Sequence, residues 1–325
     1  MPLIGIDLGG TKLASAVFGA DGEILHRESI PLAGRGGSDV GVLIAEQVRI
    51  ISGRPTRVPQ VPAQPADAVG VAIPGIYRAS TGTVWAPNIP GWDDYPLLDE
   101  LRASVGPGTR IAIDSDRAAY ILGETWRGDA RGARDAVFVA VGTGIGVGIL
   151  ADGRVLRGHA GIAGAVGWLA LQRPYRAEYA WCGCFEHHAS GPGLVKVARE
   201  AMEQDPSYTG ELRRATARAD EITTAELFVA YERRDPVATR VIDDAIELWG
   251  MAAANLVSLF DPETVVFGGG VFGPARRFLD RIRGVAVRWG QPISMQHVTF
   301  TASALGSDAG LYGAGRLALM ASDSR

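Results

Sequence analysis

Two glycine-rich turns, each following a short apolar run, carry the residue types best suited to chemistry. In the first, Asp7 ends a strand-like run and precedes a turn made of Gly9, Gly10, Thr11 and Lys12. Glycines let backbone N–H groups approach a phosphate closely, and a carboxylate at a strand end can hold Mg²⁺. The turn therefore predicts a phosphate site in which Asp7 holds the Mg²⁺ of a nucleotide.

The second turn repeats this pattern after the apolar run 137–141. Thr143 and Gly144 lie between further glycines, so a hydroxyl stands beside backbone groups suited to a γ-phosphate. An ordinary glycine hairpin explains one such turn, but two copies facing each other across a cleft favour a nucleotide site. Neither turn matches Gly-x-x-x-x-Gly-Lys-Ser/Thr or places Gly-x-Gly-x-x-Gly at the start of a helix, which argues against P-loop and Rossmann sites.

A third glycine run follows an expected strand at 264–267. It consists of Gly268, Gly269 and Gly270, and it is compatible with a nucleotide. The run favours an adenine nucleotide as the ligand.

The acceptor side of such a site needs a base, and Asp114-Ser115-Asp116 lies where the expected strand 110–113 gives way to a helix. A carboxylate there can accept the proton of an attacking hydroxyl. Ser and Asp are also good helix N-caps, and the spacing leaves both roles open. Asn88, in a Pro- and Gly-rich loop, could bind a sugar hydroxyl or simply form a turn.

The elements that position these residues form two similar halves. Each half opens with strand, glycine turn and strand, and Asp-Gly then favours a further hairpin at Gly22 and Gly153. We expect residues 1–117 with 306–325 to form an N-terminal α/β lobe and 118–305 a larger C-terminal α/β lobe. Further expected elements are a strand at 68–73, helices at 224–231, 236–260 and 306–321, the last packing back on the first lobe, and a surface loop at 54–65.

Composition sets limits on the partners. The chain has 325 residues, 47% of them hydrophobic, and a formal net charge of −4, which is enough apolar content for two domains. This charge gives no reason to expect nucleic acid or a membrane surface as partner. With two cysteines and no signal-like N-terminus, we expect a cytoplasmic protein and a small diffusing substrate, and we expect a homodimer.

Taken together, these motifs resemble the ROK family of bacterial sugar kinases and related repressors. The resemblance runs from Asp7 to the C-terminal part of the chain. Its motifs are Asp7 to Lys12, Pro74-Gly75, Asn88 to Trp92, Ser115-Asp116, Leu122-Gly123-Glu124, Gly142 to Gly146, Gly183 to Glu186, Ala189-Ser190-Gly191, Asp261 to Gly270, Asp308-Ala309-Gly310 and Gly313-Ala314. Repressors of the family carry a helix-turn-helix domain ahead of the first motif; none precedes Asp7, which favours the kinase branch.

The resemblance implies a fold and a set of roles. The fold is the two-lobed actin-like, or ribonuclease H-like, ATPase fold, with ATP and sugar in the cleft between the lobes. Asp116 would be the catalytic base, and Asn88 and Glu186 would bind sugar hydroxyls. Gly75 and Ser115 stand at matching positions on the substrate side. ATP and Mg²⁺ are the implied cofactors.

Departures from the family pattern bear on the acceptor. Family members read Ala-Gly-Glu-x-Gly-His where this chain has residues 163–168, so a sugar-binding Glu is Ala165 and a His is Trp168. The Asn before the catalytic Asp is Ser115. Trp168 and Ala165 could shape the acceptor pocket, or Trp168 could pack as core. The family zinc motif is shortened to Cys182-Gly183-Cys184, and we expect no structural zinc, although Cys182, Cys184, His187 and His188 have the right atom types.

The sequence therefore predicts an ATP-dependent carbohydrate kinase. The expected acceptor is a modified hexose such as an amino sugar, or a C7 cyclitol, with plain glucose as an alternative. An idle sugar-sensing protein and a kinase that uses polyphosphate are the other readings of the same motifs.

Overall fold

The computed structural model describes residues 3–52, 66–105, 108–216 and 222–323, and the structural statements below concern those residues. The segment 54–65, predicted as a surface loop, lies outside them. In the described part of the chain, no helix is long and apolar enough to cross a membrane.

The N-terminal lobe is built on a five-stranded sheet of order β3-β2-β1-β4-β7. Its strands are β1 (Leu3–Leu8), β2 (Lys12–Phe18), β3 (Ile24–Pro31), β4 (Ala68–Ile73) and β7 (Arg110–Ser115). β1 pairs antiparallel with β2 and parallel with β4, so the chain makes a meander followed by crossovers. The rest of this lobe consists of α1 (Gly37–Ser52), β5 (Ile76–Arg78), β6 (Thr83–Trp85) and α2 (Leu97–Val105).

The second sheet repeats the first in order and direction. Its order is β10-β9-β8-β11-β12, with antiparallel pairing of β8 to β9 and parallel pairing of β8 to β11. The strands are β8 (Ala136–Val141), β9 (Ile145–Ala151), β10 (Arg154–Val155), β11 (Thr264–Gly268) and β12 (Thr299–Ala302). The predicted internal repeat is thereby confirmed at the level of topology.

Helices occupy the rest of the second half. They are α4 (Tyr179–Cys182), α5 (Cys184–Ala189), α6 (Gly191–Gln204), α7 (Glu211–Thr216), α8 (Thr224–Glu232), α9 (Pro236–Phe260), α10 (Phe272–Ala275), α11 (Leu279–Trp289) and α12 (Pro292–His297), with short 3-10 turns η1 (Val166–Trp168), η2 (Arg276–Phe278) and η3 (Gly306–Asp308). The predicted helices at 224–231 and 236–260 are confirmed. Asp235 caps α9 by accepting from the N–H groups of Val237 and Ala238 at 3.0 Å, and Pro236 suits the first helical position.

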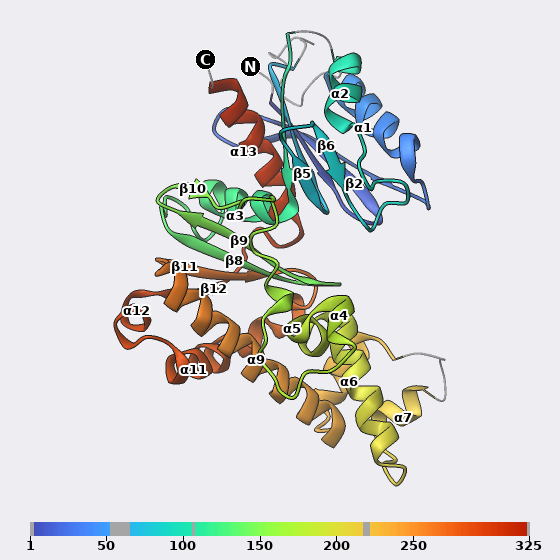
Figure 1. Ribbon diagram of the computed structural model, residues 1–325, viewed down its shortest axis with the longest axis vertical. Coiled ribbons are helices and arrows are strands. Elements are labelled where there is room, and N and C mark those ends of the chain that lie inside the picture. The colour runs from blue at the N-terminus through green and yellow to red at the C-terminus, as the bar shows by residue number, and fades with distance from the viewer. Residues whose placement is uncertain (1–2, 53–65, 106–107, 217–221, 324–325) are drawn as a thin grey trace.

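Two helices, α3 (Asp116–Arg127) and α13 (Ala309–Asp323), lie between the two sheets (Figure 1). α13 packs on β1, β4 and α3, so the predicted return of the C-terminal helix to the first lobe is confirmed. Ala72, Ala119 and Ala314 form a tight contact on the first sheet, whereas Ile121 packs with Phe138 on the second. A large core of the second lobe and a smaller core of the first lie on the outer sides of the sheets. The strands that lead to Asp7, the glycine turns and Asp116 are therefore held by two separate cores.

Candidate active site

The first glycine turn connects β1 to β2. The N–H of Gly9 donates to the carbonyl of Lys12 at 2.9 Å and closes the turn. Gly10, Thr11 and Lys12 are exposed, whereas Asp7 is half-buried. Gly310, near the start of α13, packs so closely on Asp7 that a Cβ there would lie 2.6 Å from Oδ2. The turn is thus open to a ligand while the carboxylate behind it is held in place.

The second glycine turn connects β8 to β9 and exposes Thr143 and Gly144. The N–H of Gly142 donates to the carbonyl of Gly144 at 2.9 Å. Glu186 on α5 reaches the same turn, because its Oε2 accepts from the N–H of Ile145 at 2.7 Å. The structure therefore brings Glu186, predicted at the sugar, next to the turn predicted at the γ-phosphate.

Asp114, Ser115 and Asp116 have three different environments at the junction of β7 and α3. Ser115 is the N-cap, and its Oγ accepts from the N–H of Ala118 at 3.3 Å. Asp114 pairs with Arg157 at 2.6 Å. Asp116 is the first residue of α3 and accepts from the N–H of Arg117 at 2.8 Å. Since Ser115 takes the capping role and Asp114 is neutralised, Asp116 is the carboxylate left for chemistry.

α3 also places Asp116 against the second lobe. A Cβ on Gly146, in β9, would lie 3.0 Å from the side chain of Arg117, and one on Gly148 would lie 2.1 Å from the Arg117 carbonyl. The residue that follows the base candidate therefore contacts β9, the strand after the second glycine turn.

Burial changes the acidity of both candidate carboxylates. It raises the pKa of Asp116 to about 6, an effect that the charge of Arg117 opposes. Burial also raises the pKa of Asp7 to about 7, with Asp116 and Asp308 adding to the shift and Lys12 opposing it. A base with a pKa near 6 is ionised at neutral pH and still able to accept a proton.

The residues around Asp7 fit a divalent cation. Arg27 donates to both carboxylate oxygens of Asp308, at 2.6 and 2.7 Å, and so compensates the charge of Asp308. The carboxylate of Asp7 still faces the negative charge of Asp116. Among the described residues, no group of three or more His, Cys, Asp or Glu side chains could hold an ion alone. Mg²⁺ that is bound through one or two carboxylates and the phosphates of a nucleotide needs no such group. The role of Asp7 stays a prediction.

A hollow of about 580 Å³ joins Asp7 to the third glycine run. Gly268, Gly269 and Gly270 line it. Gly270 N would lie 3.9 Å from a Cβ on Gly142, so the third run lies beside the start of the second turn. Gly269 has a φ of +89°, a conformation that favours glycine. Sequence reasoning missed the rest of the wall, which includes Tyr120, Phe138, Phe272, Arg276, Ser303 and Ser307.

One buried network supports this wall. Glu124, 0% exposed at the C-terminal end of α3, accepts from Ser303 Oγ and from the N–H of Asp129, the latter at 2.9 Å. Asp129 in turn accepts from the N–H of Ala304 at 2.7 Å. α3 therefore begins at the base candidate and ends by holding one side of the nucleotide hollow. The family match at Leu122-Gly123-Glu124 was the one signal in the sequence for this residue.

Asn88 and Gly75 lie in the first lobe beside the first turn. Asn88 is exposed, and its Cβ lies 3.7 Å from the place of a Cβ on Gly10. Its loop is rigid, since Trp92 is 1% exposed and donates from its indole N–H to the Gly37 carbonyl at 3.0 Å. Gly75 packs against the carbonyl of Trp85 with no room for a Cβ.

Ala165 and Trp168 flank the other side of the site. Trp168 is 57% exposed, so the alternative that it packs as core is wrong. A Cβ on Gly167 would lie 2.8 Å from Oε2 of Glu186, the oxygen that accepts from the N–H of Ile145. Trp168 is the residue after Gly167, so it lies next to this contact. Ala165, half-buried, accepts from the N–H of Trp168 through its carbonyl at 3.3 Å.

The cysteine segment has other partners. Cys184 is buried and its thiol contacts the Gln172 carbonyl at 3.8 Å, while His188 Nε2 hydrogen-bonds Tyr179 Oη at 2.8 Å. His187 is 2% exposed and its ring nitrogens have no hydrogen-bond partner.

Purified protein is expected to hold less than one zinc per chain, because a tetrahedral site needs four converging ligands. Elemental analysis after dialysis tests this expectation. One tightly held zinc per chain, lost in Cys182→Ser or Cys184→Ser, would contradict it.

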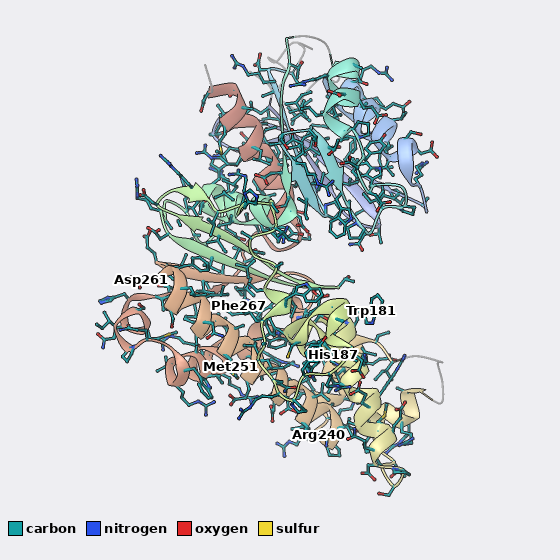
Figure 2. All side chains as sticks on the ribbon, in the orientation of Figure 1. Trp181, His187, Arg240, Met251, Asp261 and Phe267 are labelled. Carbon is teal, nitrogen blue, oxygen red and sulfur yellow. The ribbon has the colours of Figure 1, made fainter. Side chains whose placement is uncertain are left out.

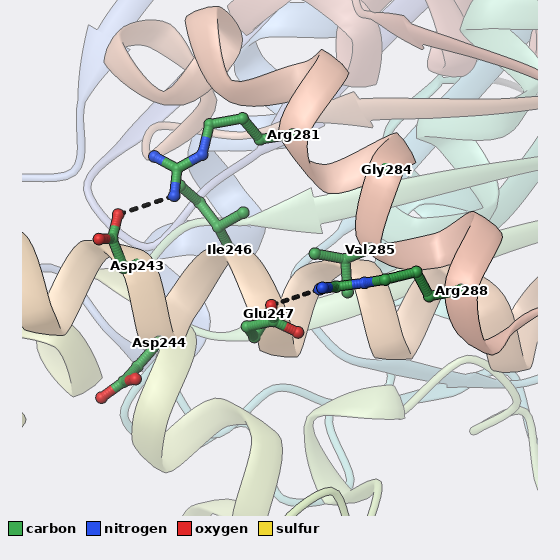
Figure 3. Close-up of a pocket in the computed structure, with 8 residues that line it drawn as sticks. All are labelled: Asp243, Asp244, Ile246, Glu247, Arg281, Gly284, Val285 and Arg288. Carbon is green, nitrogen blue, oxygen red and sulfur yellow. Dashed lines mark hydrogen bonds and ion pairs between the residues drawn. The ribbon is translucent and has the colours of Figure 1, made fainter.

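Other hollows lie apart from the glycine turns. One of about 480 Å³ lies between α9 and α11 (Figure 3), where Arg281 pairs with Asp243 and Arg288 with Glu247. These pairs satisfy the charges of the two helix faces. None of the predicted site residues lines this hollow.

Comparisons with known proteins agree with this geometry. The chain is 31% identical over 320 residues to a glucokinase of Halalkalibacterium halodurans, covering 97% of this chain and 94% of that protein. The structure of a ROK family glucokinase from Streptomyces griseus in complex with glucose and AMPPNP superposes with a TM-score of 0.77 at 30% identity, covering 98% of this chain and 100% of that one. A ROK hexokinase from Thermus thermophilus superposes with a TM-score of 0.78 at 30% identity, covering 98% of each chain.

These superpositions confirm the actin-like ATPase fold. The ROK family itself matches residues 3–321. The resemblance is therefore confirmed, and the chain belongs to the ROK family.

Proposed function

We propose that this ATP-dependent carbohydrate kinase phosphorylates a modified hexose, such as an amino sugar, or a C7 cyclitol, with Asp116 as general base. The observation that carries the reaction is a hollow lined by Asp7 and the third glycine run, with Gly142 of the second turn beside Gly270. The glucokinase of Streptomyces griseus, whose structure holds glucose and AMPPNP, supports a sugar and an adenine nucleotide as the two substrates.

In the proposed mechanism, the glycine turns hold the phosphates while Asn88 and Glu186 orient the acceptor. Asp116 takes the proton of the attacking hydroxyl of the acceptor. The γ-phosphoryl group of ATP transfers to the oxygen of that hydroxyl, and ADP leaves. Mg²⁺ held by Asp7 would neutralise charge on the phosphates. Catalysis of this kind consists mostly of positioning and electrostatic stabilisation.

The acceptor proposal rests on Ala165 and Trp168. A site can be built to hydrogen-bond sugar hydroxyls through a Glu and a His. When such a site binds a ligand that lacks those hydroxyls, the Glu and the His are left unpaired. This chain instead offers an open position at Ala165 and an exposed indole at Trp168, which favours a ring with an apolar edge. Plain glucose and an idle sensor remain the competing functions. We also propose a homodimer without a nucleic-acid partner.

An acceptor screen tests the proposal. ADP release is measured with glucose, glucosamine, N-acetylglucosamine, N-acetylmannosamine and a C7 cyclitol, using the parent and Ala165→Glu/Trp168→His. The parent is expected to prefer the amino sugar or cyclitol. The double variant should shift toward glucose or an N-acetyl hexosamine and lose about 1–3 kcal/mol for the parent's acceptor, the cost of unpaired buried polar groups.

Trp289→His is the matched control, since Trp289 is an exposed tryptophan of α11. An unchanged rank order in the double variant, with only lowered stability, would make Trp168 structural. No ADP release with any acceptor would favour the idle sensor.

A further inference from the structure

Three exposed aromatic side chains lie on the connection between β10 and α5. Trp168, Tyr175 and Trp181 expose 57%, 73% and 89% of their surface, and we call them the aromatic rim. In contrast, Trp92 and Trp249 are 1% and 0% exposed. Single exposed apolar residues need no explanation, but a group of them beside a site marks a surface for a ligand.

The rim residues are gathered by close backbone contacts. A Cβ on Gly183 would lie 2.6 Å from the Cα of Trp168, so the two segments touch. α4, which carries Trp181, packs beside η1, which carries Trp168. Tyr175 meets Tyr179 of α4 edge-on, with ring centroids 5.9 Å apart. The segments that carry the three side chains are thus packed on one another.

The helix that carries Trp181 rests on a rigid base. Tyr179 is 5% exposed and packs edge-on against His187 and His188, at 5.2 and 5.6 Å. Burial lowers the pKa of both histidines, so the rings pack as neutral groups. Figure 2 shows His187 inside the lobe and Trp181 at its edge beside α4. Trp181 is therefore exposed on a helix, α4, whose Tyr179 side is packed against the lobe.

The rim continues the acceptor side of the cleft. Glu186 contacts both Ile145 and Gly167, and Trp168 is the next residue. The segment leading to η1 also reaches the first lobe, because a Cβ on Gly161 would lie 3.2 Å from Ile76. A ligand held by Glu186 would consequently lie beside the segment that carries Trp168.

The arginine that follows Tyr175 is paired. Arg176, which follows Tyr175, pairs with Glu200 at 3.2 Å and with Glu178 at 3.4 Å. Its charge is thereby satisfied, and nothing in the rim itself is charged. Flat aromatic faces contact flat or methylene-rich rings well, and such contacts fix the orientation of a ligand in a shallow site.

We propose that the aromatic rim is a second acceptor subsite, which binds a further ring joined to the one that is phosphorylated. The ring is either a second sugar or an aromatic aglycone, since both present a flat face to tryptophan. This inference rests on the proposed function and extends it, because it makes the preferred acceptor a glycoside larger than one ring.

Three ligands test the subsite: methyl glucosaminide, phenyl glucosaminide and the disaccharide of glucosamine. Binding to the full chain is measured by calorimetry with ADP and Mg²⁺ present, and ADP release is measured separately with ATP. The parent should bind the phenyl glycoside or the disaccharide about tenfold more tightly than the methyl glycoside, the effect of one good ring contact. Trp181→Ala should abolish that difference and leave methyl glycoside binding within about twofold.

Trp289→Ala is the control, as another exposed tryptophan, on α11, and it should change none of the three affinities. Preference for the phenyl glycoside alone would identify an aromatic aglycone, and preference for the disaccharide alone a second sugar. Equal binding of all three ligands by the parent, or a parallel loss for all three in Trp181→Ala, would overturn the subsite while leaving the kinase proposal intact. No binding and no ADP release with any acceptor would overturn both.

Discussion

Asp116→Asn is expected to lower kcat on the order of 10²–10⁴-fold, the usual contribution of a positioned general base, with little change in the KM for ATP. The residue is suited to this role because Ser115 caps α3 and Arg157 neutralises Asp114. Steady-state ADP release with a saturating acceptor measures the effect. Asp152→Asn, on an exposed hairpin turn, is the control and should retain turnover. Near-parental kcat in Asp116→Asn would remove Asp116 from the mechanism.

The pH profile gives the same prediction a second readout. With a folded-state pKa of about 6, Asp116 must lose its proton to act, so kcat/KM of the parent should fall as pH drops below about 6. The residual activity of Asp116→Asn should lack this limb.

The folding stability of the parent should depend on pH in the opposite direction from its activity. The raised pKa means that the native state binds the proton of Asp116 more tightly than the unfolded chain does, so ionisation costs stability above about pH 6. This cost disappears as pH falls below the ordinary value of 3.8. Asp116→Asn should therefore melt no lower than the parent at pH 8, and a loss of activity with a lower melting temperature would indicate misfolding instead.

The repeat of the two halves could be predicted because its signals are local. Alternating apolar residues, a glycine turn and an Asp-Gly hairpin occur within about 20 residues of chain, and each specifies its own strand pair. The helix 236–260 was equally readable, because apolar residues recur at helical spacing and Asp261-Pro262-Glu263 ends the helix.

Contacts between distant segments could not be read in the same way. Glu124 and Ser303 are 179 residues apart, and Asp114 and Arg157 are 43 apart, so their pairing depends on how the sheets pack. The exposure of Trp168 has the same origin. It follows from the close approach of Gly183 to Gly167 and Trp168, which leaves the indole outside the core. A sequence pattern alone could assign Trp168 to either place.

Asp7→Asn is expected to lower kcat by about 10²–10³-fold, the scale of removing one group that stabilises charge in the transition state. An amide oxygen is a weaker Mg²⁺ ligand than a carboxylate, so the variant should also need more Mg²⁺ than the parent for half-maximal rate. Mn²⁺ binding followed by electron paramagnetic resonance, with AMPPNP present, measures the metal site without turnover. Asp152→Asn, on the exposed turn between β9 and β10, is the control and should bind Mn²⁺ as the parent does.

The affinity of the parent for the metal should depend on pH with a definite sign. Burial and the charge of Asp116 raise the pKa of Asp7 to about 7 in the metal-free protein, and the metal needs the ionised carboxylate. Metal binding must then displace a proton below pH 7, so the apparent affinity for Mn²⁺ should fall as pH drops from 8 to 6, and this dependence should flatten in Asp7→Asn. Equal Mn²⁺ affinity and the same pH dependence in parent and variant would show that Asp7 does not hold the metal.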